Sequence, residues 1–134
     1  MLVKETQATL HQKMSEKLRP LGLTVPQYAC LQALYDRPEI TGSELARQVF
    51  VSRQSMNVLL QGMEKRGLIE RSNKPGPRRE RATTLTNHAV SLARESRTAV
   101  AEVATTMTAD LTVQQQSTLE SLLRTCCDAL RSAP

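Results

Sequence analysis

Apolar residues in this chain recur mostly every three or four positions, which is the spacing of helices that bury one face. The pattern predicts a helix over residues 5–19, which Pro20 stops because proline cannot donate a backbone hydrogen bond. It predicts a second helix from the cap Thr24 to about residues 36–38, with Pro26 in its first turn. The apolar side of this second helix consists of Tyr28, Leu31, Leu34 and Tyr35.

A short helix and a longer helix are predicted next. Thr41 and Glu44 have the spacing of a capping box, a hydroxyl followed three residues later by a carboxylate. Ser52 caps a longer helix over about residues 53–66, and Gly67 ends it. The buried sides of these two helices are predicted to be Leu45, Ala46 and Val49, and then Met56, Leu59, Leu60 and Met63. A short helix, a connection of about three residues and a longer helix make a helix-turn-helix.

Beyond Gly67 the pattern changes from helical to strand-like. Residues 68–71 and 82–86 read as strands, and Lys74-Pro75-Gly76-Pro77 between them reads as a turn, so a β-hairpin wing is predicted. A long helix over residues 87–109 and a last helix, which begins at a capping box of Thr112 and Gln115, complete the chain. Their apolar stripes contain Leu92, Val100, Val103 and Met107, and then Leu119, Leu122, Leu123, Cys126 and Leu130.

The fold class is therefore mainly α with a small β-hairpin wing. A winged helix-turn-helix over residues 23–87 is flanked by dimerisation helices at 1–22 and 88–134, all within one compact domain. The flanking helices carry more apolar surface than the small winged helix-turn-helix can cover, so we expect them to pair with a second copy. A two-fold dimer would present two reading helices about one turn of DNA apart, roughly 34 Å.

Composition agrees with a helical core. The 134 residues include one Phe, two Tyr and no Trp, so the core must be built from Leu, Val, Ala and Met, which favours packed helices over a β-sandwich. No apolar run approaches the length of a membrane span, and no signal peptide is recognisable. We therefore expect a cytoplasmic protein without a membrane partner.

The positive charge is concentrated in the middle of the chain. Residues 41–87 carry nine basic and four acidic side chains, a net of +5, whereas residues 1–40 carry +1 and residues 88–134 carry −1. A polyanion is therefore expected to bind this middle third. A basic surface without a nucleic-acid partner stays the alternative.

The predicted reading helix presents one polar face. Arg53, Gln54, Asn57 and Gln61 fall together on the side away from its apolar stripe. Gln and Asn can form paired hydrogen bonds with adenine, and Arg with guanine, so this face suits base edges in duplex DNA. An arginine at the wing tip can enter the minor groove, although a loop that contacts phosphates alone stays possible. The predicted DNA-binding residues are Thr41, Ser43, Ser52, Arg53, Gln54, Ser55, Asn57, Gln61, Lys74, Arg78, Arg79 and Arg81.

Other chemistry is weakly represented. The chain has two histidines without metal-ligand spacing and no glycine-rich phosphate loop, so neither an enzyme, a metal nor a cofactor is predicted. Cys30 stands alone and Cys126 and Cys127 are adjacent, which is typical of small apolar residues in a reducing compartment. A thiol-based redox sensor stays an alternative, and it would need an exposed, electropositive cysteine. A winged-helix module for protein–protein assembly is the other alternative.

Several segments together resemble the multiple-antibiotic-resistance regulator (MarR) family. They are Leu23-Thr24 with Gln27, Leu31 and Leu34; residues 43–46 (Ser-Glu-Leu-Ala); residues 51–55 (Val-Ser-Arg-Gln-Ser); residues 63–71 (Met-Glu-Lys-Arg-Gly-Leu-Ile-Glu-Arg); and Leu85-Thr86. The resemblance covers about residues 20–90 by motif and the flanking helices by layout.

The resemblance implies a homodimer that binds palindromic promoter DNA, usually as a repressor, and that is released by small, often aromatic ligands. It places recognition positions at Ser52, Arg53, Gln54, Ser55 and Asn57. The family commonly has Asp-Arg-Arg at the wing tip, where this chain has Pro77-Arg78-Arg79, so the minor-groove arginine Arg79 is kept without its usual aspartate. The ligand candidates that follow from the family's pocket between reading lobe and dimerisation helices are His11, Met14, Arg19 and Tyr28.

Overall fold

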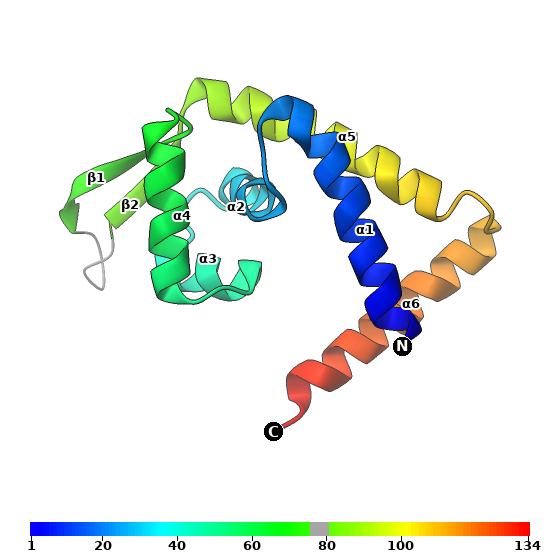
Figure 1. The fold of residues 1–134 in the computed structure, drawn as a ribbon. Helices are drawn as coiled ribbons and strands as arrows, with labels where there is room; N and C mark the ends of the chain where they lie inside the picture. The colour runs from blue at the N-terminus through cyan, green and yellow to red at the C-terminus, as the bar shows by residue number, and fades with distance from the viewer. Residues whose placement is uncertain (76–80) are drawn as a thin grey trace.

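A computed structural model describes the backbone of residues 1–75 and 81–134, and the side chains of residues 1–72 and 83–134 (Figure 1). It is mainly helical with one small antiparallel sheet, as the sequence predicts. In chain order the elements are α1 (Leu2–Leu18), the 3₁₀ turn η1 (Arg19–Leu21), α2 (Val25–Asp36), α3 (Gly42–Val49), α4 (Arg53–Lys65), β1 (Ile69–Pro75), β2 (Arg81–Leu85), α5 (Asn87–Met107) and α6 (Val113–Ser132).

The first helix begins three residues earlier than expected, at Leu2, and ends at Leu18, one residue before the end predicted from Pro20. The chain does not straighten there, because Arg19 keeps helical backbone angles and the chain continues as the tighter turn η1. The reversal occurs at Gly22, whose φ of 71° is left-handed and whose N–H donates to the Arg19 carbonyl (2.9 Å). Glycine takes this conformation without the strain that a side chain would add.

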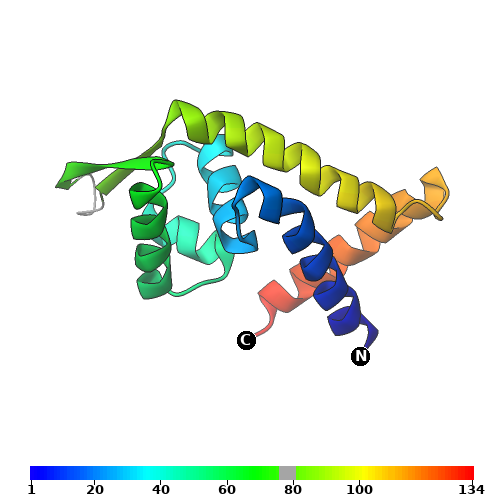
Figure 2. The same cartoon turned by 45° about the horizontal axis from the view of Figure 1, so that its top comes forward.

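Helix α2 is the centre of the core. Its start is fixed by a capping box, in which the Gln27 N–H donates to Thr24 Oγ1 (3.2 Å) and the Thr24 N–H donates to Gln27 Oε1 (3.0 Å). The helix packs against α1, α3, α4, α5 and β2, which surround it in Figures 1 and 2. The largest buried side chains around it are Leu18, Leu31, Leu34, Leu45, Met56, Met63, Leu68 and Ile69, with Cys30 among them. The core therefore consists of the aliphatic and sulfur-containing residues that the composition predicts, while Tyr28 and Tyr35 are half-buried at its edge.

The first strand of the wing is longer than the sequence suggests. The turn predicted to begin at Lys74 is wrong, because β1 continues through Lys74 to Pro75, which pairs with Arg81. The register shifts between Arg71 and Pro75, so the strand bulges there. A two-stranded sheet has free edges on both sides, and an edge or a bulge tolerates proline because the missing N–H is not needed for pairing.

The last two helices extend away from the core. Helix α5 begins at the cap Thr86 and runs the length of the molecule, and α6 turns back from its far end (Figures 1 and 2). The capping box predicted for α6 is present, with Gln115 N–H to Thr112 Oγ1 at 3.1 Å and Thr112 N–H to Gln115 Oε1 at 2.9 Å. No residue of α6 is buried. None of the described helices is long and apolar enough to cross a lipid bilayer.

Candidate nucleic-acid interface

Helices α3 and α4 form the predicted helix-turn-helix. Thr41 caps α3 by accepting from the Glu44 N–H (3.1 Å), and Ser52 caps α4 by accepting from the Ser55 N–H (3.0 Å). Between them Phe50 adopts a left-handed conformation, with a φ of 63°, and the Val51 N–H donates to the Ala46 carbonyl (3.0 Å). This closing turn is short, so α4 leaves α3 at a fixed angle.

An ion pair stabilises the start of α3. Arg37 Nη2 lies 2.7 Å from Glu44 Oε2, and the Thr41 hydroxyl donates to Glu44 Oε1 (2.9 Å). The hydrogen bond from Arg37, followed by that from Thr41, lowers the pKa of the Glu44 carboxyl below its ordinary value. Thr41 and Ser43, both predicted to contact DNA, are half-buried at this helix start.

Helix α4 presents the predicted polar face to solvent. Met56, Leu60 and Met63 are buried on one side, with Leu59 half-buried beside them. On the other side the predicted base-reading residues are all exposed, namely Arg53, Gln54, Asn57 and Gln61. Ser52 and Ser55 are exposed too, but the Ser52 hydroxyl also donates to Ser55 Oγ (3.0 Å), so these two hydroxyls serve the helix start first.

The wing is tied to the end of α4. Gly67 ends the helix with a φ of 73°, the Thr86 hydroxyl donates to the Gly67 carbonyl (2.7 Å), and the Thr86 N–H donates to Leu68 O (3.1 Å). Lys74 and Arg81 lie on β1 and β2, where the backbone alone is described. Arg78 and Arg79, like Pro77, fall outside the described residues, so their predicted contacts with the minor groove stay predictions.

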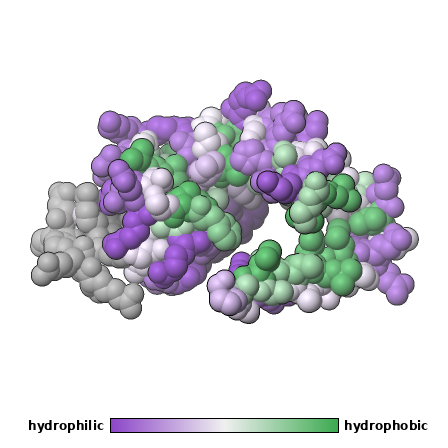
Figure 3. Space-filling model, turned by 60° about the horizontal axis from the view of Figure 1, so that its bottom comes forward, coloured by the Kyte–Doolittle hydropathy of each residue, from purple (hydrophilic) through white to green (hydrophobic). Residues whose placement is uncertain are grey.

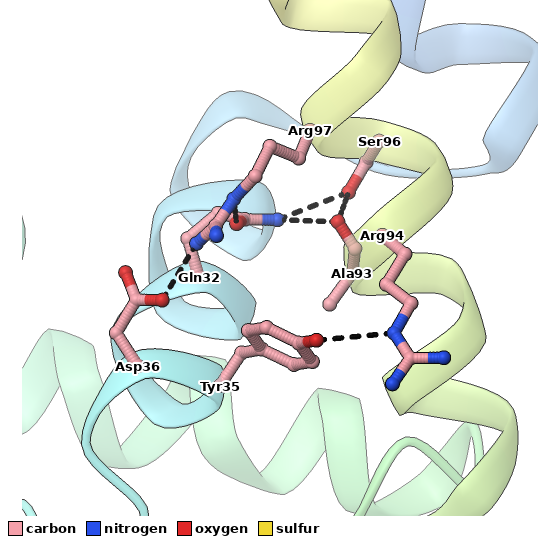
Figure 4. A network of polar contacts seen from close by, with 7 residues as sticks. All are labelled: Gln32, Tyr35, Asp36, Ala93, Arg94, Ser96 and Arg97. Carbon is pink, nitrogen blue, oxygen red and sulfur yellow. Dashed lines mark hydrogen bonds and ion pairs between the residues drawn. The ribbon is translucent and has the colours of Figure 1, made fainter.

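A polar network joins α2 to the long helix α5 (Figure 4). Gln32 Nε2 donates to the Ala93 carbonyl (2.7 Å) and to Ser96 Oγ (3.3 Å), while Arg97 Nε donates to Gln32 Oε1 (2.6 Å). Arg97 Nη2 also lies 2.7 Å from Asp36 Oδ1. These bonds connect α2 side chains to α5 along about one helical turn. They therefore fix how residues 23–87, which we call the reading unit, are oriented on α5.

Tyr35 adds an aromatic contact to this junction. The Arg94 Nε donates to the Tyr35 hydroxyl (3.0 Å), and the guanidinium carbons of Arg94 and Arg97 lie 5.9 and 5.3 Å from the Tyr35 ring centre. These are cation–π distances. The neighbouring Tyr28 is half-buried, and burial raises the pKa of its hydroxyl, against the opposing charge of Arg97.

A groove of about 630 Å³ lies between α1 and the far end of α5. Its walls include Leu2, Leu10, Lys13, Lys17, Val103 and Met107. None of the four predicted ligand residues is among those that line it: His11 and Arg19 are exposed, and Met14 and Tyr28 are half-buried. The ligand assignment of these four residues therefore stays a prediction.

The three cysteines occupy two different environments. Cys30 is buried in the core, and burial raises the pKa of its thiol to about 12. Cys126 and Cys127 are exposed on α6. Since the thiolate is the reactive form, Cys30 is unsuited to sensing oxidants.

Comparison with known proteins identifies the family of this helix-turn-helix. The sequence model of the MarR family matches residues 21–80. The HTH-type transcriptional repressor Rv2887 of Mycobacterium tuberculosis is 34% identical over 116 residues, which cover 87% of this chain and 84% of the relative. The chain belongs to the MarR family. MarR proteins are transcription regulators rather than enzymes.

Solved MarR structures have the same fold. Rv2887 in complex with DNA is 30% identical and superimposes with a TM-score of 0.77, and its complex with salicylic acid is 32% identical with a TM-score of 0.75; each alignment covers 93% of both chains. Apo MarR from E. coli is 24% identical with a TM-score of 0.79, again over 93% of both chains, and this likeness concerns the fold.

Within this MarR fold, the structure brings together the four polar residues predicted for α4 and separates them from the ligand candidates on α1, η1 and α2. It also shows a residue that the sequence reasoning missed. Val58 lies among the polar residues of α4 and is 65% exposed. Its spacing could have revealed this, because a residue two positions after Met56 points to the opposite side of a helix.

Proposed function

We propose that this chain is a homodimeric repressor that binds palindromic promoter DNA through α4 and is released from it by a small aromatic ligand. The observation that carries the proposal is the exposed polar face of α4, in which Arg53, Gln54, Asn57 and Gln61 suit base edges in the major groove. DNA binding by the relative Rv2887 supports it. Thr41, Ser43, Ser52 and Ser55 at the helix starts, and Lys74, Arg78, Arg79 and Arg81 in the wing, complete the proposed contact set.

The homodimer is supported by apolar surface that one chain leaves uncovered. Leu122, Leu123 and Leu130 on α6 are 59%, 52% and 77% exposed, at spacings that put them on one face. Leu2 and Met107 at the groove between α1 and α5 are exposed as well. Residues 1–22 and 88–134 are accordingly the proposed dimerisation helices, and residues 23–87 the reading unit, acting on DNA in the cytoplasm.

A small aromatic acid is the proposed effector class. Rv2887 forms a complex with salicylic acid, and the proposed site in this chain combines the exposed Arg19 and His11, which can bind a carboxylate, with the half-buried Tyr28 and Met14. Binding there would lie between the reading unit and the dimerisation helices, where it could change their relative orientation. Arg19→Ala is expected to weaken salicylate binding in calorimetry, and an unchanged affinity would remove Arg19 from the site.

The experiment that tests the proposed function is selection of bound fragments from genomic DNA with the full chain. A palindrome should emerge, and the affinity for it should fall by roughly 0.9 log units per log unit of salt for each phosphate contact. Asn57→Ala should then cost about 1–3 kcal/mol at particular base pairs. If Asn57→Ala weakens binding equally on every DNA sequence, Asn57 contacts the DNA backbone and not the bases. Failure to enrich any fragment would favour a protein-assembly role.

A further inference from the structure

Val58 is an apolar side chain in the middle of a polar surface. Gln54 precedes it by four residues and Gln61 follows it by three, so the three side chains are neighbours along one side of α4. All three are exposed, and Val58 keeps 65% of its surface accessible. The helix has already buried its own apolar stripe of Met56, Leu60 and Met63 against the core, so Val58 is not needed for folding.

The surroundings of Val58 limit what can cover it. The residues three and four positions from it along α4 are Gln54, Ser55, Gln61 and Gly62, so none of them extends it into an apolar patch of the size that binds another protein. Valine is also short and has one strongly preferred rotamer in a helix, so its methyl groups reach only a partner that the helix approaches closely. A helix seated in the major groove makes such an approach.

The major groove contains one prominent apolar group, the C5-methyl of thymine. We infer that Val58 is a specificity-determining residue that contacts a thymine methyl in each half-site, with Gln54 and Gln61 forming hydrogen bonds to neighbouring base edges. This role rests on the proposed function, because it requires α4 to lie in the major groove. It adds a preference that the polar residues cannot supply, since an amide does not distinguish thymine from the same base without its methyl group.

The test uses the full chain and the palindrome that fragment selection yields. Each thymine is replaced in turn by deoxyuridine, which keeps base pairing and removes only the methyl group. Wild-type protein should lose about threefold to fivefold in affinity per half-site at one thymine position, the effect of leaving one methyl group uncovered. Val58→Ala should lose a similar factor on the natural site and then be indifferent to uracil at that position, because both changes remove the same contact.

Two variants serve as controls. Gln61→Ala, on the same face, should weaken binding but keep the full sensitivity to uracil at the Val58 position. Val58→Thr retains one methyl group and should keep part of that sensitivity. The thermal midpoint of Val58→Ala should match the wild type, since the side chain is exposed.

The outcomes separate the two proposals. Tight binding to the palindrome with no uracil effect at any thymine overturns the role of Val58 and leaves DNA binding by α4 intact. A uracil effect that persists in Val58→Ala also overturns it, because another residue then contacts the methyl group. Failure to bind any DNA overturns both proposals together.

Discussion

The reading unit and the distal arm of this molecule differ in how much apolar surface a single chain covers. The reading unit, α2 to β2, surrounds a core in which Leu31, Leu45, Met56 and Met63 are almost inaccessible. The arm consists of the N-terminal half of α1, the far end of α5, and α6. It is apolar along one side and has no buried residue in α6, and Figure 3 shows apolar residues along it beside an open gap.

This difference indicates what each region needs in order to be stable. The reading unit buries its apolar residues within the chain, so its fold depends mainly on its own sequence. The arm has helix caps and apolar residues at helical spacing, but caps alone stabilise long helices weakly in water. Its leucines stabilise the fold little until another surface covers them. The network of Gln32, Asp36 and Arg97 joins α2 of the reading unit to the middle of α5, the helix whose far end belongs to the arm.

The largest expected effect comes from placing charge on the exposed apolar face of the arm. If the proposed dimer forms through this face, Leu122→Glu combined with Leu123→Glu should convert it to a monomer, because burying carboxylates against leucines is unfavourable. The monomer should lose the benefit of two linked reading helices, so its affinity for the palindrome should fall by about a hundredfold or more. Sedimentation and DNA titration measure the two effects.

The matched control for that variant is Ser117→Glu combined with Ser121→Glu. It adds the same charge to the face of α6 opposite the leucines, where both residues are exposed, and should leave the proposed dimer intact. Equal behaviour of the two double variants would show that the leucine face is not the dimer interface.

Removing one leucine from each region sharpens the comparison. Leu34 is 2% exposed in the reading unit, and Leu34→Ala should lower the free energy of unfolding by about 2–5 kcal/mol at every protein concentration, because it leaves a cavity. Leu130→Ala, at 77% exposure, should leave the folding of one chain unchanged and act through association alone. Denaturant unfolding across a range of protein concentrations separates the two, and a concentration-independent loss in Leu130→Ala would contradict the distinction.

The polar contacts between α2 and α5 should contribute less to the free energy of unfolding than the buried leucines do. Arg97→Gln removes the ion pair with Asp36 and one contact with the Tyr35 ring, and is expected to cost about 1 kcal/mol, since exposed pairs are screened by water. The ionic share should decrease as salt is added. Arg124→Gln, which breaks the Glu120 pair within α6, is the control and should have a smaller effect; equal losses would mean that Arg97 does not tie the two regions together.

The smallest effect is a difference in thiol labelling. Cys30 should stay unlabelled in the native protein because it is buried and its pKa is raised to about 12. Cys127 should react first, whereas Cys126 lies on the same face as the α6 leucines and should be shielded by the partner. In the Leu122→Glu, Leu123→Glu variant the two thiols should react alike, and rapid labelling of Cys30 would show that the core opens.

Much of the reading unit could be predicted from the sequence because its determinants are local. Thr24, Thr41, Ser52 and Thr112 are identified as caps or as parts of capping boxes from residue type and spacing, and each accepts the N–H three residues on. Thr86, which the sequence pattern placed at the end of a strand, caps α5 in the same way. The polar face of α4 also follows from helical periodicity alone. These features depend on a few neighbouring residues, so a short stretch of chain is sufficient to specify them.

The tertiary structure decided what the local patterns leave open. Helix α1 ends before Pro20 as predicted, but the chain winds on through η1 and reverses only at Gly22. Pro75 was predicted to lie in a turn, but it pairs with Arg81 in the wing. The junction of Gln32 and Asp36 with Arg97 joins residues more than sixty positions apart, which no periodicity reveals. The exposed state of the α6 leucines likewise depends on which surfaces the rest of the chain covers. The sequence by itself determined the helices, their caps and the face that α4 presents, because those are set by near neighbours; packing between distant segments decided where the chain reverses, how the reading unit is held and which apolar residues are left for a partner.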